Sequence, residues 1–174
     1  MSKSGILLFR QAKKTGTVLS SYRIFFMIWK PNVTVAAIIE QDGKFLLVEE
    51  YTSQGVLFNQ PAGHLEEGES LLAAVARETL EESAYTFEPQ HLIGIYRWHS
   101  PVADTTYLRF AFAGRILAHH PQRALDEGII RAVWMTPEEL RASQAHHRSP
   151  LVLRCVEDYL SGKRYPLELL VHYA

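Results

Sequence analysis

One stretch narrows the possible folds more than any other part of the sequence: residues Gly63 to Glu82 read GHLEEGESLLAAVARETLEE. Within it, selected residues follow the spacing G-x5-E-x7-R-E-x2-E-E: Gly63, Glu69, Arg77, Glu78, Glu81 and Glu82. With a chance of about 6 % per specified residue, this spacing should arise in such a chain with a probability on the order of 10⁻⁵. It is therefore no coincidence, and it requires a glycine-containing loop that leads into a helix.

The helix predicted from Ser70 to about Ser83 carries an acidic stripe. Because each helical residue advances by about 100°, Glu78, Glu81 and Glu82 lie within one arc beside an apolar face. Like charges at these spacings each destabilise a helix by about 0.2–0.5 kcal/mol unless a cation neutralises them. Oxygen ligands on a rigid element suit Mg²⁺, with Mn²⁺ as the alternative. The stripe therefore predicts a divalent metal site.

The residues around the stripe decide between a metal site and a merely solvated acidic face. Three glutamates alone are more typical of a solvated face. Gly63 favours the metal site, because glycine lets a ligand or metal approach its backbone carbonyl closely. Arg77 lies one turn before Glu81 and reaches Glu69 if the loop folds back, so we expect it to orient the carboxylates. The general base stays open among Glu81, Glu82 and loop acids such as Asp104 and Glu127.

The order of the predicted elements indicates an α+β domain, an α/β/α sandwich with a mixed sheet covered on both faces. Strands are predicted over residues 33–39, 45–49, 57–59, 91–98, 106–114 and 129–135, and residues 61–68 are predicted to form a loop. Asp42-Gly43 predicts a hairpin between the first two strands. Thr136-Pro137 and Ser149-Pro150 predict the starts of two further helices, the last ending near Gly162.

Composition excludes several classes of protein. The net charge of −1 combines six Lys or Arg and no acid in residues 1–30 with a net −7 in the remainder, which argues against nucleic-acid binding. Cys155 is the single cysteine, so a small core residue and a cytoplasmic location are expected. The apolar runs of the first 30 residues are shorter than the roughly 20 residues of a membrane span.

The first 26 residues admit three interpretations. They form a transit peptide, or an extension upstream of a natural start at Met27, or an ordered element that packs on the domain. The expected division is an N-terminal extension over residues 1–26 and one domain over residues 27–174.

The pattern in residues 63–82 resembles the Nudix box, G-x5-E-x7-R-E-U-x-E-E-x-G-U, where U is a bulky aliphatic residue. The likeness extends to PNVTVAAII, FNQPAGHLE, YLRFAF, RSPLV and SGKRYPLE, which together resemble the bacterial NudJ-type phosphatases over about residues 27–170. The resemblance implies Mg²⁺-dependent hydrolysis of nucleoside triphosphates and diphosphates and of hydroxymethylpyrimidine diphosphate. It also supports Met27 as the start. The expected partner is a small-molecule nucleotide or diphosphate substrate, and the expected assembly is a monomer or homodimer.

Three positions depart from the box without touching the acidic stripe. Thr79 replaces an aliphatic residue, and its hydroxyl needs a partner such as a carbonyl one turn back. Ala84 replaces a glycine, which costs about 1 kcal/mol in the left-handed conformation or changes the helix end. Tyr85 replaces the final aliphatic residue. We expect these changes to alter the helix end rather than the activity.

Residues outside the box are weaker candidates for substrate binding. Asn59, Gln60 and His64 flank the loop and are positioned to hydrogen-bond a phosphate. Arg109 either binds substrate or forms a cross-strand ion pair, since strand alternation places it opposite Leu108 and Phe110. Aromatic residues in strands pack in the core more often than they stack on a base, and this applies to Tyr96, Trp98 and Trp134.

Two other functions compete with the phosphatase interpretation. An ADP-ribose or other nucleoside-diphosphate-sugar pyrophosphatase is suggested by Pro101, which lies where such enzymes of the superfamily carry a proline. Val102 replaces the glycine that usually follows it. The second alternative is a catalytically silent nucleotide-sensing module, although such a module need not keep the metal-binding acids, Glu69 and Arg77.

Overall fold

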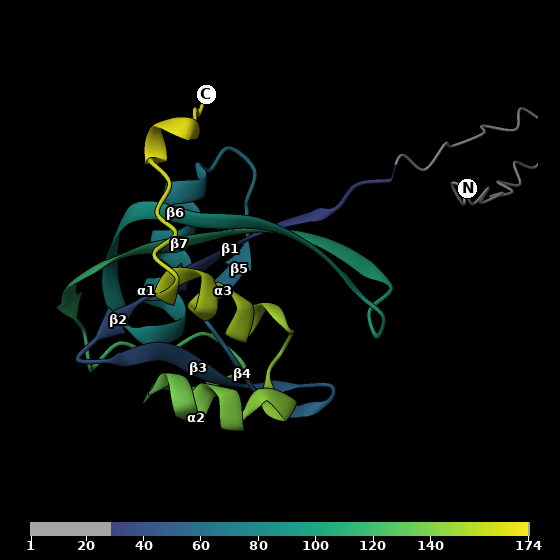
Figure 1. Cartoon of the computed structure of the whole chain (residues 1–174), viewed down its shortest axis with the longest axis vertical. Coiled ribbons are helices and arrows are strands. Elements are labelled where there is room, and N and C mark those ends of the chain that lie inside the picture. The colour runs from purple at the N-terminus through teal and green to yellow at the C-terminus, as the bar shows by residue number, and fades with distance from the viewer. Residues whose placement is uncertain (1–28, 174) are drawn as a thin grey trace, which may run out of the picture. The chain divides into compact units, whose positions relative to one another are not determined.

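Two four-stranded sheets form the framework of the domain (Figure 1). The structure, a computed structural model, describes residues 29–173. The first sheet has the order β5-β1-β7-β6, and the second has the order β2-β3-β4 with β8 paired to β3. The strands are β1 (Asn32–Ile38), β2 (Glu40–Gln41), β3 (Lys44–Thr52), β4 (Gly55–Asn59), β5 (Ala62–His64), β6 (Tyr85–Ser100), β7 (Thr105–His119) and β8 (Ile129–Met135).

Helices cover both faces of the first sheet. These are α1 (Leu71–Ser83) on one face and α3 (Leu151–Leu160) on the other. Helix α2 (Pro137–Ala142) packs against β8 and α3, and the short 3-10 helices are η1 (Gln144–His146) and η2 (Leu167–Leu169). Val35 packs with Val75 of α1 in one core cluster, whereas Ile38 packs with Val156 of α3 in the other. The first sheet is mixed, because β1 runs parallel to β7 and antiparallel to β5. The predicted α+β class and mixed sheet are confirmed.

The first two predicted strands form, but not as a simple hairpin pair. The Asp42-Gly43 turn joins only β2 to the start of β3, with Glu40 opposite Phe45. The preceding strand β1 instead joins the other sheet, between β5 and β7. Its residues from Val35 to Ile38 are all buried, as expected for a central strand with both faces covered. The predicted hairpin turn at Asp42-Gly43 is therefore confirmed, but the first predicted strand lies mostly in the other sheet, paired with β5 and β7.

Several element boundaries differ from the prediction. Residues 61–68, predicted as a loop, contain the short strand β5. β6 begins at Tyr85, directly after α1, and its register with β7 shifts near Pro89. Both strands of this hairpin run beyond the predicted 91–98 and 106–114. The local pattern missed these ends because a register shift interrupts the period-2 alternation.

The predicted ends of the helices are confirmed. Ser70 caps α1 by accepting a hydrogen bond from the Ala73 N–H at 3.1 Å. The Thr79 hydroxyl donates to the Val75 carbonyl one turn back at 2.7 Å. Ala84 takes the left-handed conformation, with φ of 60° and ψ of 20°. Thr136 forms the expected capping box at α2, and Cys155 is fully buried in α3.

The predictions for the N-terminus lie outside the described residues. The proposed extension over residues 1–26 and the start at Met27 fall there. Within residues 29–173, no helix is long and apolar enough to cross a membrane.

Candidate active site

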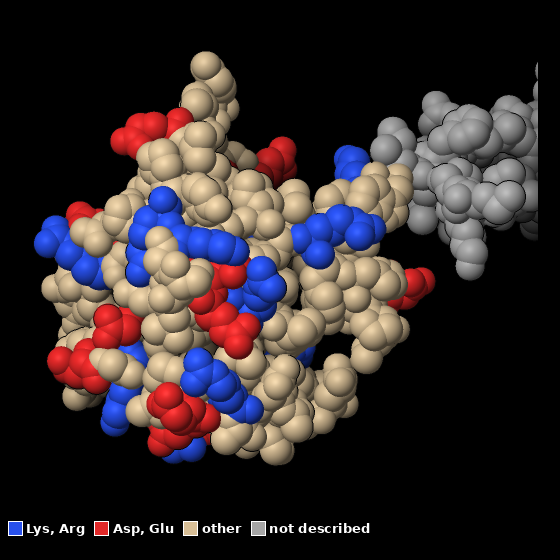
Figure 2. Space-filling model, in the orientation of Figure 1, with Lys and Arg blue, Asp and Glu red and all other residues tan. Residues whose placement is uncertain are grey.

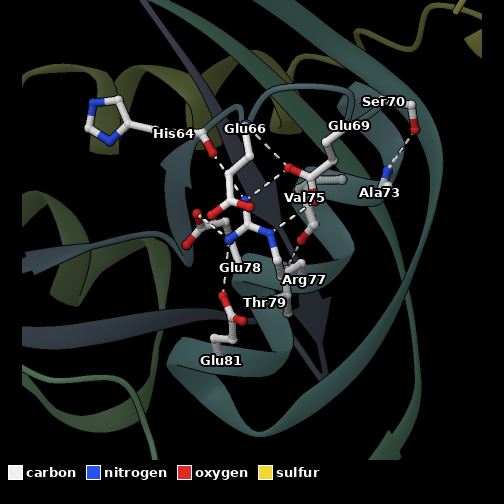
Figure 3. A network of polar contacts seen from close by, with 10 residues as sticks. All are labelled: His64, Glu66, Glu69, Ser70, Ala73, Val75, Arg77, Glu78, Thr79 and Glu81. Atoms are coloured by element: carbon white, nitrogen blue, oxygen red, sulfur yellow. Dashed lines mark hydrogen bonds and ion pairs between the residues drawn. The ribbon is translucent and has the colours of Figure 1, made fainter. Parts of the chain in front are cut away.

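Arg77 is the centre of the polar network around the acidic stripe (Figure 3). Its Nε and Nη2 donate to the two carboxylate oxygens of Glu69 at 2.9 and 3.0 Å. Its Nη1 donates to Glu78 Oε1 at 2.8 Å and to Glu81 Oε2 at 3.0 Å, and Nη2 also reaches the His64 carbonyl at 3.1 Å. The loop therefore folds back onto the helix as predicted, and one guanidinium fixes three carboxylates.

These contacts stabilise the charged forms of Glu69 and Arg77, the pair that joins the loop to the helix. Hydrogen bonds from Arg77 lower the pKa of Glu69, and hydrogen bonds to Glu69 raise the pKa of Arg77. A bidentate arginine–carboxylate pair restricts orientation as well as distance. Arg77 is thus placed to position the stripe.

Glu78 explains why the loop requires a glycine. A Cβ added at Gly63 would overlap the carboxylate of Glu78. Glu78 is only 8 % exposed, and its burial raises the pKa of its carboxyl although Arg77 opposes the shift. Any other residue at position 63 would displace this carboxylate.

Glu82 is held from the other side, by the backbone of β5. Its Oε2 accepts a hydrogen bond from the Ala62 N–H at 2.8 Å. Burial raises the pKa of Glu82 to about 8, and the charges of Glu78, Glu50 and Asp126 add to the effect. A neighbouring cation would favour its ionised form.

The donor chemistry of the stripe fits a hard divalent cation. Among the described residues, the second oxygen of each carboxylate accepts no hydrogen bond, namely Glu78 Oε2, Glu81 Oε1 and Glu82 Oε1. All these donors are oxygens, the ligands that Mg²⁺ and Mn²⁺ prefer. In residues 29–173, however, no three acidic, His or Cys side chains already stand at ligand spacing. To hold an ion together, the glutamates would have to turn toward one another.

Two acids next to the stripe were not predicted. Glu50 of β3 is 17 % exposed, and its Oε1 is buried without a hydrogen bond, with Arg148 Nε at 3.9 Å. Asp126 lies in the loop between β7 and β8, and its N–H donates to the carbonyl of Glu81, near the end of α1, at 3.0 Å. The sequence could have indicated Glu50, because strand alternation places it on the same face of β3 as Leu46 and Val48.

The two loop acids considered as general bases lie in the β6–β7 turn and in the loop between β7 and β8. Asp104 is in the turn between β6 and β7, where its carboxylate stands 3.5 Å from His99 Nε2. Glu127 is exposed, and its neighbour Asp126 is the residue whose charge raises the pKa of Glu78 and Glu82. Glu81 and Glu82 remain on the stripe itself.

Asn59, Gln60 and Arg109 are brought together in the interior. The Arg109 guanidinium donates to Gln60 Oε1 at 3.3 Å and to Asn59 Oδ1 at 3.5 Å. Gln60 is oriented by its own amide, which donates to the Val152 carbonyl of α3 at 2.7 Å. Arg109 has no carboxylate within ion-pair distance among the described residues, so the cross-strand ion pair is excluded. Burial lowers the pKa of Arg109.

The aromatic candidates have different environments. Tyr96 packs against the α3 core cluster and donates to Asp158 Oδ2 at 2.9 Å. Trp134 packs edge-on against Tyr85 in the α1 core cluster. Both are therefore core residues, as strand aromatics usually are. Trp98 also packs against the α3 core cluster, and in addition it stacks on Tyr107 across the β6–β7 hairpin.

Comparison with known proteins agrees with this geometry. The NUDIX domain family matches residues 29–155. The chain belongs to the NUDIX hydrolase family. Over 144 residues it is 44 % identical to the phosphatase NudJ of Escherichia coli K12, covering 82 % of this chain and 92 % of that protein. The resemblance to NudJ-type phosphatases is thus confirmed, and the chain is a hydrolase of the pyrophosphohydrolase or phosphatase type.

Solved structures support the family. A NUDIX hydrolase from Nitrosomonas europaea is 56 % identical, with a TM-score of 0.81, over 83 % of this chain and 98 % of that one. A bifunctional NMN adenylyltransferase/ADP ribose pyrophosphatase from Francisella tularensis, solved with AMP and a Mn ion, shares the fold at 14 % identity and a TM-score of 0.65. That match covers 78 % of this chain and 43 % of that protein. NUDIX hydrolases generally use a divalent metal.

Proposed function

We propose that the protein uses Mg²⁺ to hydrolyse phosphoanhydride bonds of nucleoside triphosphates and diphosphates, and also of hydroxymethylpyrimidine diphosphate. One observation carries the proposal: a stripe of three carboxylates, two fixed by Arg77 and the third by the Ala62 N–H, lies at the edge of the sheet whose interior holds Arg109 without an ion-paired carboxylate. A cation at the stripe and an arginine that forms no direct ion pair are the complementary halves of a site for a diphosphate.

In this proposal, different residues bind the metal, position the carboxylates and act as the general base. Glu78, Glu81 and Glu82 would hold the metal, with the Gly63 carbonyl as a further ligand. Bound metal supplies neutralisation of phosphate charge and activation of water. Arg77 and Glu69 position the carboxylates, and Glu81 and Glu82 are the candidates for the general base.

We assign phosphate binding to Arg109 and its two interior partners, Asn59 and Gln60. Arg109 is kept free for an anion because its partners, Asn59 and Gln60, are neutral amides. His64 is exposed at the end of β5 and can donate to the same ligand. In this assignment substrate lies across the edge strand β5, from the acidic stripe to Arg109.

The competing functions gain no specific support. Pro101 is exposed in the β6–β7 turn, and Val102 beside it is 68 % exposed, so the turn offers no built site for ADP-ribose. The silent module is disfavoured because the acids, Glu69 and Arg77 are all present and connected.

A substrate panel tests the proposal. Phosphate release from GTP, GDP and hydroxymethylpyrimidine diphosphate is measured with Mg²⁺, and AMP formation from ADP-ribose is followed beside it. We expect turnover of the first three and its loss in Glu82→Gln, with Glu138→Gln, an exposed change on α2, as the matched control. Exclusive turnover of ADP-ribose, or near wild-type activity of Glu82→Gln, would overturn the assignment.

The remaining expectations accompany this proposal. We place the catalytic domain at residues 27–174, with residues 1–26 as an extension, and we expect a cytoplasmic monomer or homodimer. Size-exclusion chromatography with light scattering of the chain with and without residues 1–26 tests the boundary and the assembly.

A further inference from the structure

One face of the first sheet carries two neighbouring rows of ligand-type side chains. Residues paired in register point to the same face of a sheet. Thr34 of β1 is opposite His64 of β5 and Arg109 of β7, and Arg109 is opposite Tyr96 of β6. Two residues further along, the next row is Asn32, Tyr107 and Trp98.

The first row is incompletely hydrogen-bonded. Thr34 is 6 % exposed, and its Oγ1 has no partner. Arg109 is 8 % exposed, and its only hydrogen bonds to described residues are the two long ones to neutral amide oxygens. Buried polar groups are satisfied in more than about 90 % of cases. Glu82 and Glu50 lie near enough to act on the charge of Arg109, but neither is within ion-pair distance, and a buried cation without a direct acidic partner beside an unpaired hydroxyl indicates a position for an anionic or acceptor group.

The second row contains a stacked aromatic pair. The Trp98 and Tyr107 rings stack with centroids 5.8 Å apart and an interplanar angle of 19°. The His64 ring lies 6.4 Å from Tyr107 at an angle of 48°. Both Trp98 and Tyr107 are half-buried, so part of each ring is open to a ligand. Such surfaces bind planar heteroaromatic rings by stacking.

His64 connects this face to the acidic stripe. Its carbonyl accepts from Arg77 Nη2 at 3.1 Å, while its ring stands beside Tyr107. Alternate residues of one strand lie about 7 Å apart, so a group at Arg109 and a ring at Tyr107 belong to one small ligand. On the face shown in Figure 2, a hollow lies between the β6–β7 hairpin and the lower part of the domain.

We propose that this face is a ring subsite, in which Tyr107 and Trp98 stack on the planar heteroaromatic group of the substrate and Arg109 and Thr34 bind its adjoining phosphate. The inference rests on the proposed function and deepens it, because it makes the organic group a determinant of specificity. The competing role is structural, since cross-strand aromatic pairs stabilise hairpins by themselves.

The kinetic test compares a substrate that has a ring with one that lacks it. GDP and an aliphatic prenyl diphosphate are hydrolysed by wild type, Tyr107→Leu and Trp98→Leu, with the 90 % exposed Tyr173→Leu as the matched control. We expect Tyr107→Leu and Trp98→Leu to raise the KM for GDP between about fivefold and a hundredfold. Their kcat for GDP and their KM for the prenyl diphosphate should stay within twofold of wild type, and the control should change neither.

A binding test separates this inference from the proposed function. In a Trp29→Phe/Trp134→Phe background Trp98 is the only tryptophan. Guanosine monophosphate without metal should quench its fluorescence saturably, ribose 5-phosphate should not, and Tyr107→Leu should weaken the quenching at least fivefold. If this background fails to fold, equilibrium dialysis of radiolabelled guanosine monophosphate against wild type and Tyr107→Leu replaces it.

The outcomes are distinct. Absence of turnover of every diphosphate would refute the proposed function, and the binding test would still decide the ring subsite. Equal loss for GDP and the prenyl diphosphate, a fall in melting temperature without a change in KM, or no quenching would show that the aromatic pair is only structural.

Discussion

Replacing Glu82 by Gln should stabilise the metal-free protein, by an amount that grows with pH. Glu82 is buried against β5, and its pKa in the folded state is about 8, whereas the ordinary value is 4.5. The folded state therefore holds this proton more tightly than the unfolded state. Wild-type stability should fall as pH rises from about 4.5 to about 8, because the unfolded chain ionises Glu82 first.

The size of the effect follows from the two pKa values. Between pH 5 and pH 7, the free energy of unfolding of Glu82→Gln should rise relative to wild type by about 2 kcal/mol. The glutamine keeps an oxygen for the Ala62 N–H, so the fold loses no hydrogen bond. With saturating Mg²⁺ the order should reverse, because the ion stabilises the wild type that binds it.

Urea unfolding with EDTA at pH 5, 6 and 7 measures this difference. The exposed change Glu138→Gln provides the control and should show a constant difference from wild type. If the difference between Glu82→Gln and wild type does not change over this pH range, the buried carboxyl does not carry the raised pKa, and the reasoning fails.

Three other substitutions test the network around the stripe. Gly63→Ala should displace the Glu78 carboxylate that it overlaps and abolish most turnover, with little change in melting temperature because only the end of a flexible side chain must move; unchanged activity would contradict this. Arg77→Lys should lower kcat/KM by about 10–100-fold with little change in melting temperature, since lysine cannot replace the bidentate contacts to Glu69; equal activity would show that carboxylate orientation is unimportant. Ala84→Gly should raise the free energy of unfolding by up to about 1 kcal/mol in urea titrations, and a loss of stability would mean that the left-handed helix end is not strained.

The acidic helix and its loop could be predicted because their determinants are local. The 3.6-residue period placed the glutamates on one stripe, and Ser70 and Thr79 behave as capping and back-bonding residues do. The contact from Arg77 to Glu69 was expected on the condition that the loop folds back onto the helix, and the structure meets this condition.

What sequence reasoning missed depends on pairing between distant segments. A buried apolar strand such as β1 fits either sheet, so its period did not show that it would leave the hairpin and pair with β7. Glu50 becomes part of the site only because β3 turns that face toward α1. The stacking of Trp98 on Tyr107 likewise depends on the register of the long β6–β7 hairpin.

The central claim is that the carboxylate stripe binds the divalent metal on which hydrolysis depends. Electron paramagnetic resonance of Mn²⁺ titrated into wild type, Glu82→Gln and the control Glu138→Gln measures this directly, with phosphate release from GDP followed in the same samples. The account predicts binding by wild type and the control, at least tenfold weaker binding by Glu82→Gln, and a parallel fall in turnover. Equal Mn²⁺ affinity of all three proteins, or full turnover in excess EDTA, would contradict it.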